Sequence, residues 1–297
     1  MKSIPPGGPH HFKGGMRLKM EGMHVIHFFW KDLSPHLILH PVVADGLSLS
    51  HPKPSLIQVH RLSLGEVWNY TVLPGRWCVG RLEEESYLPC PEGRVLKEFH
   101  ICPRCRASLG KPTLREIFEP EEGCEGEICE KPHVVYLAFY GEKMKVGMTP
   151  EERLLKRAVE QGADAVGVLL HLENRREARA EEKRISKELR VPQALPAREI
   201  LAGMSRGFKR EVIEERYRRV LEAVGGEEEL TILRGYPLER LSSAPSPWKG
   251  KRIHGRVLGA KGRYIIVQMG GPKAINTGKL LGRVLVEGST KPSLEEF

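Results

Sequence analysis

The sequence lacks any stretch suited to a membrane. No run in its 297 residues approaches the ~20 apolar positions of a transmembrane helix. The N-terminal residues 1–15 are rich in proline and glycine and lack the apolar core of a secretory signal. The chain also has no His-Glu-x-x-His motif, nucleophile elbow or Rossmann fingerprint, which argues against those enzyme classes. We therefore expect a cytoplasmic protein with no membrane partner.

Acidic residues are absent from Arg240 to Val286, although they are frequent elsewhere in the chain. The net charge is +9 and the pI is about 9.3, and a basic surface attracts polyanions because bound phosphates release their counterions. The interval therefore predicts a nucleic-acid-binding surface, formed by Lys249, Lys251, Arg252, Arg256, Lys261 and Arg263. Trp248, His254 and Tyr264 lie between these residues. They either stack on unpaired bases or belong to the core.

Cysteine is absent outside positions 78–129. In a cytoplasmic chain, such clustering around the pair Cys102 and Cys105 indicates a metal site before disulfides. Cys124 and Cys129 are the expected second pair, and four thiolates would hold a closed, structural zinc site. Three roles are open for the other two cysteines, Cys78 and Cys90. They are apolar core residues, one of them replaces Cys124 or Cys129 as a ligand, or they form a second site with His100 or His133. An iron–sulfur cluster and a redox pair are the alternatives to zinc.

The segment from His133 to Glu182 carries the most specific pattern. Apolar runs at Val134–Tyr140 and Met144–Met148 flank Gly141-Glu142-Lys143, which is typical of a hairpin. A basic helix, a third apolar run at Val166–Leu170 and a charged helix follow. Hairpin, helix, strand and helix in this order resemble the core of the GIY-YIG nuclease domain. The chain as a whole resembles a prokaryotic (archaeal and bacterial) domain-of-unknown-function family, in which a cysteine cluster precedes such a domain.

The resemblance implies a set of site residues. Tyr136 and Gly147 match the two strand motifs, while Lys145 occupies the place of the second tyrosine. The family's phosphate-binding arginine corresponds to Arg157, with Arg153 as the second choice. Its metal-binding glutamate corresponds to Glu182, next to Glu181, and its asparagine has only the loose counterparts Gln193 and Asn174. Lysine has an unperturbed pKa of about 10.4 and would be a poor proton relay, so Lys145 favours binding of the backbone over cleavage.

These patterns together predict an α+β protein. We expect an N-terminal β region at 1–77, a cysteine-rich zinc-binding segment at 78–132, a GIY-YIG-like α/β domain at 133–235 and a basic C-terminal β region at 248–297. The expected strands are 16–20, 23–29, 36–39, 56–60, 67–72, 251–258, 263–269 and 282–286, and a helix is expected over 205–224. The C-terminal strands are expected to pack on the N-terminal ones.

Three functions fit the sequence. The first is a zinc-stabilised nucleic-acid-binding protein that prefers RNA, with a degenerate GIY-YIG-like domain on the phosphodiester backbone. The second is an active Mg-dependent endonuclease that uses Tyr136, Lys145, Arg157 and Glu182. The third is an assembly factor associated with the ribosome or another RNP. The lysine at position 145 argues against the second function, and the acid-free interval argues against a purely protein-binding role.

Overall fold

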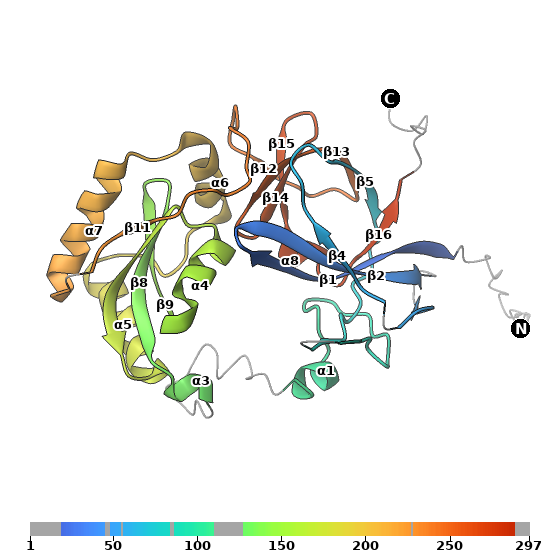
Figure 1. The fold of residues 1–297 in the computed structure, drawn as a ribbon, viewed down its shortest axis with the longest axis horizontal. Coiled ribbons are helices and arrows are strands. Elements are labelled where there is room, and N and C mark those ends of the chain that lie inside the picture. The colour runs from blue at the N-terminus through green and yellow to red at the C-terminus, as the bar shows by residue number, and fades with distance from the viewer. Residues whose placement is uncertain are drawn as a thin grey trace, which may run out of the picture.

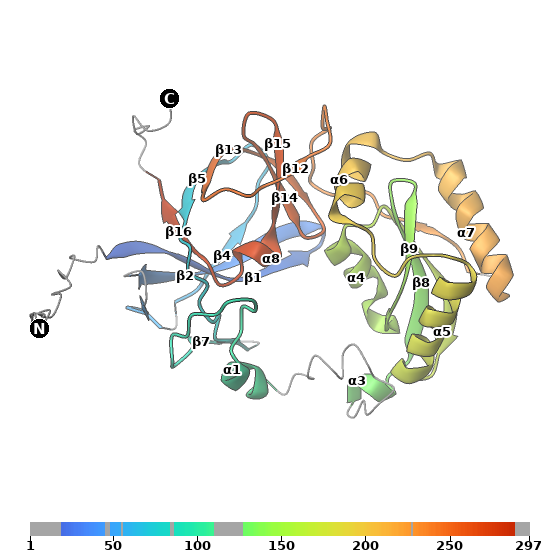
Figure 2. The ribbon, with the colours of Figure 1, turned by 180° about the vertical axis from the view of Figure 1, so that it is seen from behind.

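The computed structural model describes residues 19–44, 48–54, 56–83, 86–109, 127–226 and 228–288. It confirms the α+β class that the sequence predicts. A strand-rich unit and an α/β unit lie side by side, and the cysteine-bearing segment packs below the strand-rich unit (Figure 1). The view from behind shows the same arrangement (Figure 2). No helix in these ranges is long and apolar enough to cross a membrane.

The strand-rich unit is built from both ends of the chain. Its ten-stranded sheet has the order β12-β15-β14-β13-β5-β16-β1-β2-β3, with β4 also paired to β2. The strands are β1 (Met20–Lys31), β2 (Ser34–Ala44), β3 (Leu49–Ser50), β4 (Gln58–Arg61), β5 (Val67–Val72), β12 (Ser246–Pro247), β13 (Arg252–Lys261), β14 (Tyr264–Gln268), β15 (Pro272–Asn276) and β16 (Val284–Glu287); the short helix α8 (Thr277–Leu280) follows β15. The C-terminal strand β16 lies between β1 and β5 and pairs with both. The sheet therefore joins strands from the two ends of the chain, and residues of both ends share an apolar cluster.

The α/β unit contains a four-stranded antiparallel sheet in the order β11-β10-β8-β9. Its elements are β8 (His133–Tyr140), β9 (Lys143–Pro150), the 3-10 turn η2 (Glu151–Arg153), α4 (Leu154–Gln161), β10 (Ala165–Leu172), α5 (Arg175–Glu188), α6 (Ala197–Arg206), α7 (Arg210–Val224) and β11 (Thr231–Ile232). Every residue of β8 is buried, as expected for a central strand covered on both faces.

Alternation along β8 gives each face of the sheet its own core. Val135, Leu137 and Phe139 pack with residues of α5 and α7, including Ile185 and Tyr217. On the other face, Tyr136 and its alternate neighbours pack with Ala158 of α4. Tyr136 therefore points to the α4 face, and α5 covers the opposite face beside the edge strand β9.

The structure differs from the sequence-based expectations at several elements. The helix expected over 205–224 is divided into α6 and α7, because Gly207 adopts a positive φ of 67° and ends α6. The strand β15 was not expected. The expected strands at 16–20 and 23–29 correspond to one long strand, β1, and residues 16–18 lie outside the described ranges.

The turn between β13 and β14 joins the two units. Gly262 in this turn approaches Gly162 so closely that a Cβ on Gly262 would lie 2.5 Å from the backbone nitrogen of Gly162. Trp30 Nε1 donates to the carbonyl oxygen of Gly262 at 2.9 Å. The neighbouring Lys261 forms an ion pair with Asp164. These contacts place the turn against the C-terminal end of α4.

Candidate functional site

Four cysteine thiols converge in the segment below the strand-rich unit. The Sγ atoms of Cys78, Cys90, Cys102 and Cys105 all lie within 4.8 Å of one another, and all four residues are buried. The sulfur atoms of Cys90 and Cys102 are 3.9 Å apart. A tetrahedral site with Zn–S bonds of ~2.3 Å has edges of about 3.8 Å. The four thiols therefore have the spacing of a closed metal site and could hold a structural metal ion.

Local hydrogen bonds position these thiols. The extended residue Cys102 caps the short helix α1 (Pro103–Ala107), and its Sγ accepts a hydrogen bond from the backbone nitrogen of Cys105 at 3.4 Å. The Cys78 Sγ accepts from the backbone nitrogen of Cys102 at 3.2 Å. Proline at the first helical position fits this tight start, because it has no N–H to satisfy there.

A hairpin brings Cys78 and Cys90 together. The strands β6 (Arg81–Leu82) and β7 (Tyr87–Leu88) pair between these two cysteines. Gly80 precedes β6 with a φ of 71°, and a Cβ there would lie 2.3 Å from the carbonyl oxygen of Leu88. Only glycine fits this close backbone approach.

Burial and local hydrogen bonds shift the pKa values of the thiols in opposite directions. Burial raises the pKa of Cys78 to about 11 and also raises the pKa of Cys105. At Cys102, burial is outweighed by hydrogen bonds from the Cys105 nitrogen and the neighbouring thiols, and the pKa is lowered. Gathered thiolates repel one another in a buried site, and a divalent cation would offset that charge.

The ligand set expected from the sequence needs correction. Cys102 and Cys105 belong to the cluster, but their partners are Cys78 and Cys90. Cys129, next to the end of α3 (Glu127–Glu130), is disulfide-bonded and is not one of the four free cysteines, while Cys124 lies outside the described residues. The physical reason is the β6–β7 hairpin. It brings Cys78 and Cys90, which are twelve positions apart, close to the pair Cys102 and Cys105. Neither His100 nor His133 is part of the described cluster.

A second group of polar side chains surrounds Tyr136, with Arg157 and Gln161 from α4 and Glu182 from α5. We call it the Tyr136 patch; it comprises Tyr136, Lys145, Arg157, Gln161 and Glu182. Tyr136 and Gly147 are cross-strand partners in the β8–β9 hairpin, and Lys145 pairs with Ala138. Because side chains alternate along a strand, Tyr136, Lys145 and Gly147 share one face. The two strand motifs are thus opposite each other.

Tyr136 is almost fully buried, with 1% of its surface exposed. Its hydroxyl lies 3.5 Å from Gln161 Oε1 and also bonds to Arg157. Burial raises the pKa of Tyr136, and the charge of Arg157 partly opposes that rise. The hydroxyl is therefore protonated at neutral pH and can donate a hydrogen bond.

Lys145 is the most perturbed cation of the patch. Burial, together with the nearby charges of Arg157 and Arg263, lowers its pKa to about 8, although Glu182 acts in the opposite direction. The expectation that Lys145 is a poor proton relay assumed the pKa of an unperturbed lysine, about 10.4. In this environment, a large fraction of Lys145 is neutral at pH 8.

Glu182 is the acidic member of the patch. It lies on α5 with 6% of its surface exposed and forms an ion pair with Arg179. Arg179 also donates to Gln193 Oε1 at 3.1 Å. Glu182 contributes to the electrostatics of both Tyr136 and Lys145. The four residues selected from the sequence are therefore near one another, while their individual roles stay predictions.

The second-choice residues have other partners. Arg153 pairs with Glu160 at 3.5 Å, and Glu181 pairs with Arg184 at 2.7 Å. Asn174 caps α5 by accepting from the backbone nitrogen of Glu177 at 3.0 Å. Of the alternatives named from the sequence, Gln193 alone connects to Glu182, through Arg179.

The sequence analysis missed Gln161 and Arg179. Gln161 accepts hydrogen bonds from the hydroxyls of both Tyr136 and Tyr140, the latter at 3.1 Å. Helical spacing could have indicated both residues. Gln161 follows Arg157 by four positions, and Arg179 precedes Glu182 by three, so each pair shares one helix face.

The basic residues of the acid-free interval have different surroundings. Lys261 is 7% exposed and pairs with Asp164, so we no longer assign it to a nucleic-acid surface. Arg256 pairs with Glu239 through contacts of 2.5 and 2.9 Å. Arg263 is close enough to Lys145 to affect its pKa. Lys249 and Lys251 line a separate hollow of about 550 Å³ with Trp248, and Arg252 follows on β13.

The interleaved aromatic residues are also divided. Tyr264 is 6% exposed and packs in an apolar cluster with Leu201 and Leu258. Trp248 donates from Nε1 to the carbonyl oxygen of Arg252 at 3.0 Å and remains partly buried. His254 lies 3.3 Å from Asn69 through Nδ1 and is exposed. The core interpretation therefore holds for Tyr264.

Comparison with known proteins gives one relationship. A family model described as "Protein of unknown function (DUF2797)" matches residues 76–285. The match covers the cysteine cluster, the α/β unit and the C-terminal strands as far as the first half of β16. No curated protein and no solved structure matches the chain. Because the matched residues make up more than half of the sequence, the chain belongs to the DUF2797 family.

Proposed function

We propose that this protein binds nucleic acid through the Tyr136 patch, with RNA preferred over DNA. The observation that carries the proposal is the lowered pKa of Lys145, near 8, in the field of Arg157 and Arg263. Cations held this close together repel one another in the free protein. A phosphodiester anion would reverse that repulsion and satisfy lysine and arginine donors at once.

The arrangement of elements supports the same proposal. The order β8, β9, α4, β10 and α5 agrees with the core order of the GIY-YIG domain that the sequence resembles. Arg157 on α4 is exposed beside the buried Tyr136 hydroxyl. An arginine in that position can hold two phosphate oxygens. The RNA preference rests on Trp248 and His254 among the basic residues, because rings that remain at least partly exposed suit unpaired bases.

We also propose that zinc is the metal at the cysteine cluster. Four thiolates without an open position form a structural site rather than a catalytic one. The segment around them has few apolar residues to bury, so metal binding would supply folding free energy there. Cys78, Cys90, Cys102 and Cys105 would be the ligands.

A second candidate is Mg-dependent cleavage of the bound backbone. The lowered pKa of Lys145 favours it, because a neutral amine can accept a proton from water. Glu182 would then hold the magnesium ion, which prefers carboxylate and water oxygens. Since Glu182 is paired with Arg179, the ion would have to displace that arginine. This cost makes binding without cleavage the first candidate.

The test is incubation of the purified protein with labelled RNA and DNA in magnesium, followed by native and denaturing gels. We expect shifted, intact RNA, and Arg157→Ala should weaken binding by about tenfold through loss of a charged hydrogen bond. The matched control is Arg218→Ala, because Arg218 on α7 is 62% exposed and lies outside the patch. Equal loss in both variants, or no shift with the unmodified protein, would contradict the binding proposal.

The denaturing gel decides between the two candidates. Discrete fragments that require magnesium and disappear in Glu182→Gln would establish cleavage. Glutamine keeps the size of the side chain and can still accept a hydrogen bond from Arg179, so the fold around α5 should survive. Intact RNA at every magnesium concentration would eliminate the nuclease candidate.

A further inference from the structure

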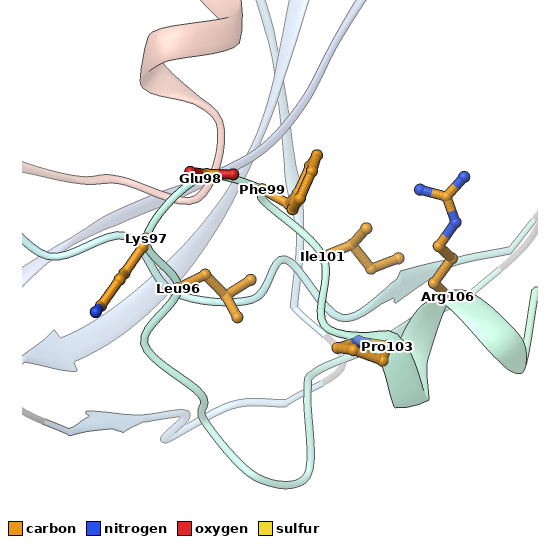
Figure 3. A pocket seen from close by; sticks show the side chains of 7 residues that line it. All are labelled: Leu96, Lys97, Glu98, Phe99, Ile101, Pro103 and Arg106. Carbon is orange, nitrogen blue, oxygen red and sulfur yellow. The ribbon is translucent and has the colours of Figure 1, made fainter. Parts of the chain in front are cut away.

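A hollow beside the cysteine cluster has the features of a binding site. Its volume is about 520 Å³, within the ~300–1,000 Å³ typical of small-molecule sites. It is lined by Leu96, Lys97, Glu98, Phe99, Ile101, Pro103 and Arg106. Figure 3 shows the apolar side chains around the hollow, with Lys97 and Arg106 on opposite sides of it.

Phe99 is the unusual member of this lining. Half of its surface is exposed, at 50%, although an aromatic ring gains most from burial. Leu96 and Ile101 are partly buried and pack against the four cysteines. The hollow therefore has an apolar wall supported by the cysteine cluster and an aromatic ring that is still in contact with water.

The loop that carries Phe99 is held in place from both sides. The backbone nitrogen of Leu96 donates to the carbonyl oxygen of Arg76 at 2.7 Å, and Arg76 in turn donates to the carbonyl oxygen of Glu98 at 2.7 Å. The backbone nitrogen of Val79 donates to the carbonyl oxygen of His100 at 2.8 Å. A ring presented by an anchored loop loses little conformational freedom on binding, which favours affinity.

We infer that this hollow binds an unpaired base of a single-stranded RNA, with the base against Phe99 and the adjacent phosphates near Lys97 and Arg106. Charge complementarity favours this occupant, because the two cationic side chains of the lining outnumber its one carboxylate, Glu98. An aromatic, apolar hollow with a cation on either side matches a flat base between two phosphates. A duplex does not fit, because its bases are stacked on one another. The inference rests on the proposed function and adds a second contact area, separate from the Tyr136 patch.

The first experiment measures binding of a fluorescently labelled 12-nucleotide single-stranded RNA to the full, metal-containing protein by anisotropy. Phe99→Ala should weaken binding about tenfold, as loss of one stacked base does, without changing the salt dependence. Phe99→Trp should bind within twofold of the unmodified protein. The matched control is Val59→Ala, which alters another exposed apolar side chain, 58% exposed on β4.

A second measurement uses the unmodified protein, so it does not depend on the folding of a variant. An RNA of the same length carrying 5-iodouridine is crosslinked by light, and the crosslinked peptide is identified by mass spectrometry. We expect the crosslink on the peptide that contains Phe99, and an abasic RNA of equal length should bind more weakly. Absence of a crosslink on the peptide that contains Phe99, equal binding of the abasic RNA, or a Phe99→Ala affinity within twofold would overturn the inference.

The outcomes separate this inference from the proposed function. If the protein binds the RNA but Phe99 makes no difference, the base site is wrong while the Tyr136 patch is unaffected. If Arg157→Ala makes no difference but Phe99→Ala weakens binding, the patch is wrong and the base site is supported. If the unmodified protein does not bind RNA, both proposals fail.

Discussion

The ring of Tyr136 lies directly against Gly147 across the β8–β9 hairpin. A Cβ on residue 147 would lie 2.8 Å from both Cζ and the hydroxyl oxygen of Tyr136. Because real Cβ atoms do not come this close to a neighbour, the glycine is required for the tyrosine to occupy its buried position. The pair therefore links the second strand motif to the placement of a hydroxyl in the Tyr136 patch.

Replacement of this glycine should displace the tyrosine. We expect Gly147→Ala to lower the free energy of unfolding by about 1–3 kcal/mol, as overpacking of a buried site does, and to weaken RNA binding. Urea denaturation and anisotropy measure the two effects. Gly278→Ala is the control, because its new Cβ would meet only the Asn276 side chain at 3.2 Å; equal destabilisation in both variants would show that the Tyr136 contact is not the cause.

Stability should rise with pH because of Lys145. The pKa of its ammonium group is lowered by burial and by Arg157 to about 8 in the folded protein, whereas an unfolded lysine has a pKa near 10.4. Between these values the unfolded state binds more protons, so the free energy of unfolding increases with pH over that window. Lys145→Met should be more stable than the unmodified protein at pH 7, by about 3 kcal/mol, and should lose this pH dependence.

The same lysine should make RNA binding sensitive to pH. A bound phosphate favours the charged amine, so affinity should decrease as the pH rises above about 8, the pKa of Lys145 in the free protein. Lys145→Arg keeps its charge over this range and should bind RNA with a flat pH profile between pH 7 and 9.5. A parallel decrease in both proteins would point to a different titrating group.

The metal content should follow the observed cysteine cluster. We expect about one equivalent of metal in the purified protein, and Cys78→Ala or Cys90→Ala should lose it, because each thiol is one of four tetrahedral ligands. Elemental analysis measures the loss of metal, and thermal unfolding measures the accompanying loss of stability. Cys129→Ala should retain the metal, since Cys129 is disulfide-bonded and lies outside the free cysteines; the opposite result would favour the ligand set expected from spacing.

Local patterns were sufficient to predict much of the α/β unit. The expected strands at 134–140 and 144–148 correspond to β8 and β9, and the run at 166–170 corresponds to β10. Gly141, with a φ of 59°, forms the turn between β8 and β9. These elements could be predicted because alternation, apolar runs and turn-forming glycines depend on only a few neighbouring residues.

The cysteine ligands and the surroundings of the basic residues were harder to predict from the sequence, for a physical reason. A short hairpin and a close backbone approach at Gly80 place Cys78 and Cys90 beside Cys102 and Cys105. The spacing of cysteines in the sequence does not predict such a contact. Similarly, the basic residues of 249–263 look alike in sequence. Lys261 is distinguished by Asp164, which lies 97 positions earlier and is brought near by packing of the two units.

The ion pair between Lys261 and Asp164 should stabilise the junction of the two units. Both side chains are largely buried, at 9% and 13% exposure, and Asp164 also accepts from the backbone nitrogen of Gly141 at 2.7 Å. Loss of one partner leaves the other charge buried, so Lys261→Ala should lower the free energy of unfolding by about 3–5 kcal/mol. By contrast, Arg256→Ala breaks an exposed pair with Glu239 and should change the free energy of unfolding far less, because solvent screens an exposed ion pair. Chemical denaturation of both variants measures this difference, and equal costs would show that the buried pair does not hold the junction.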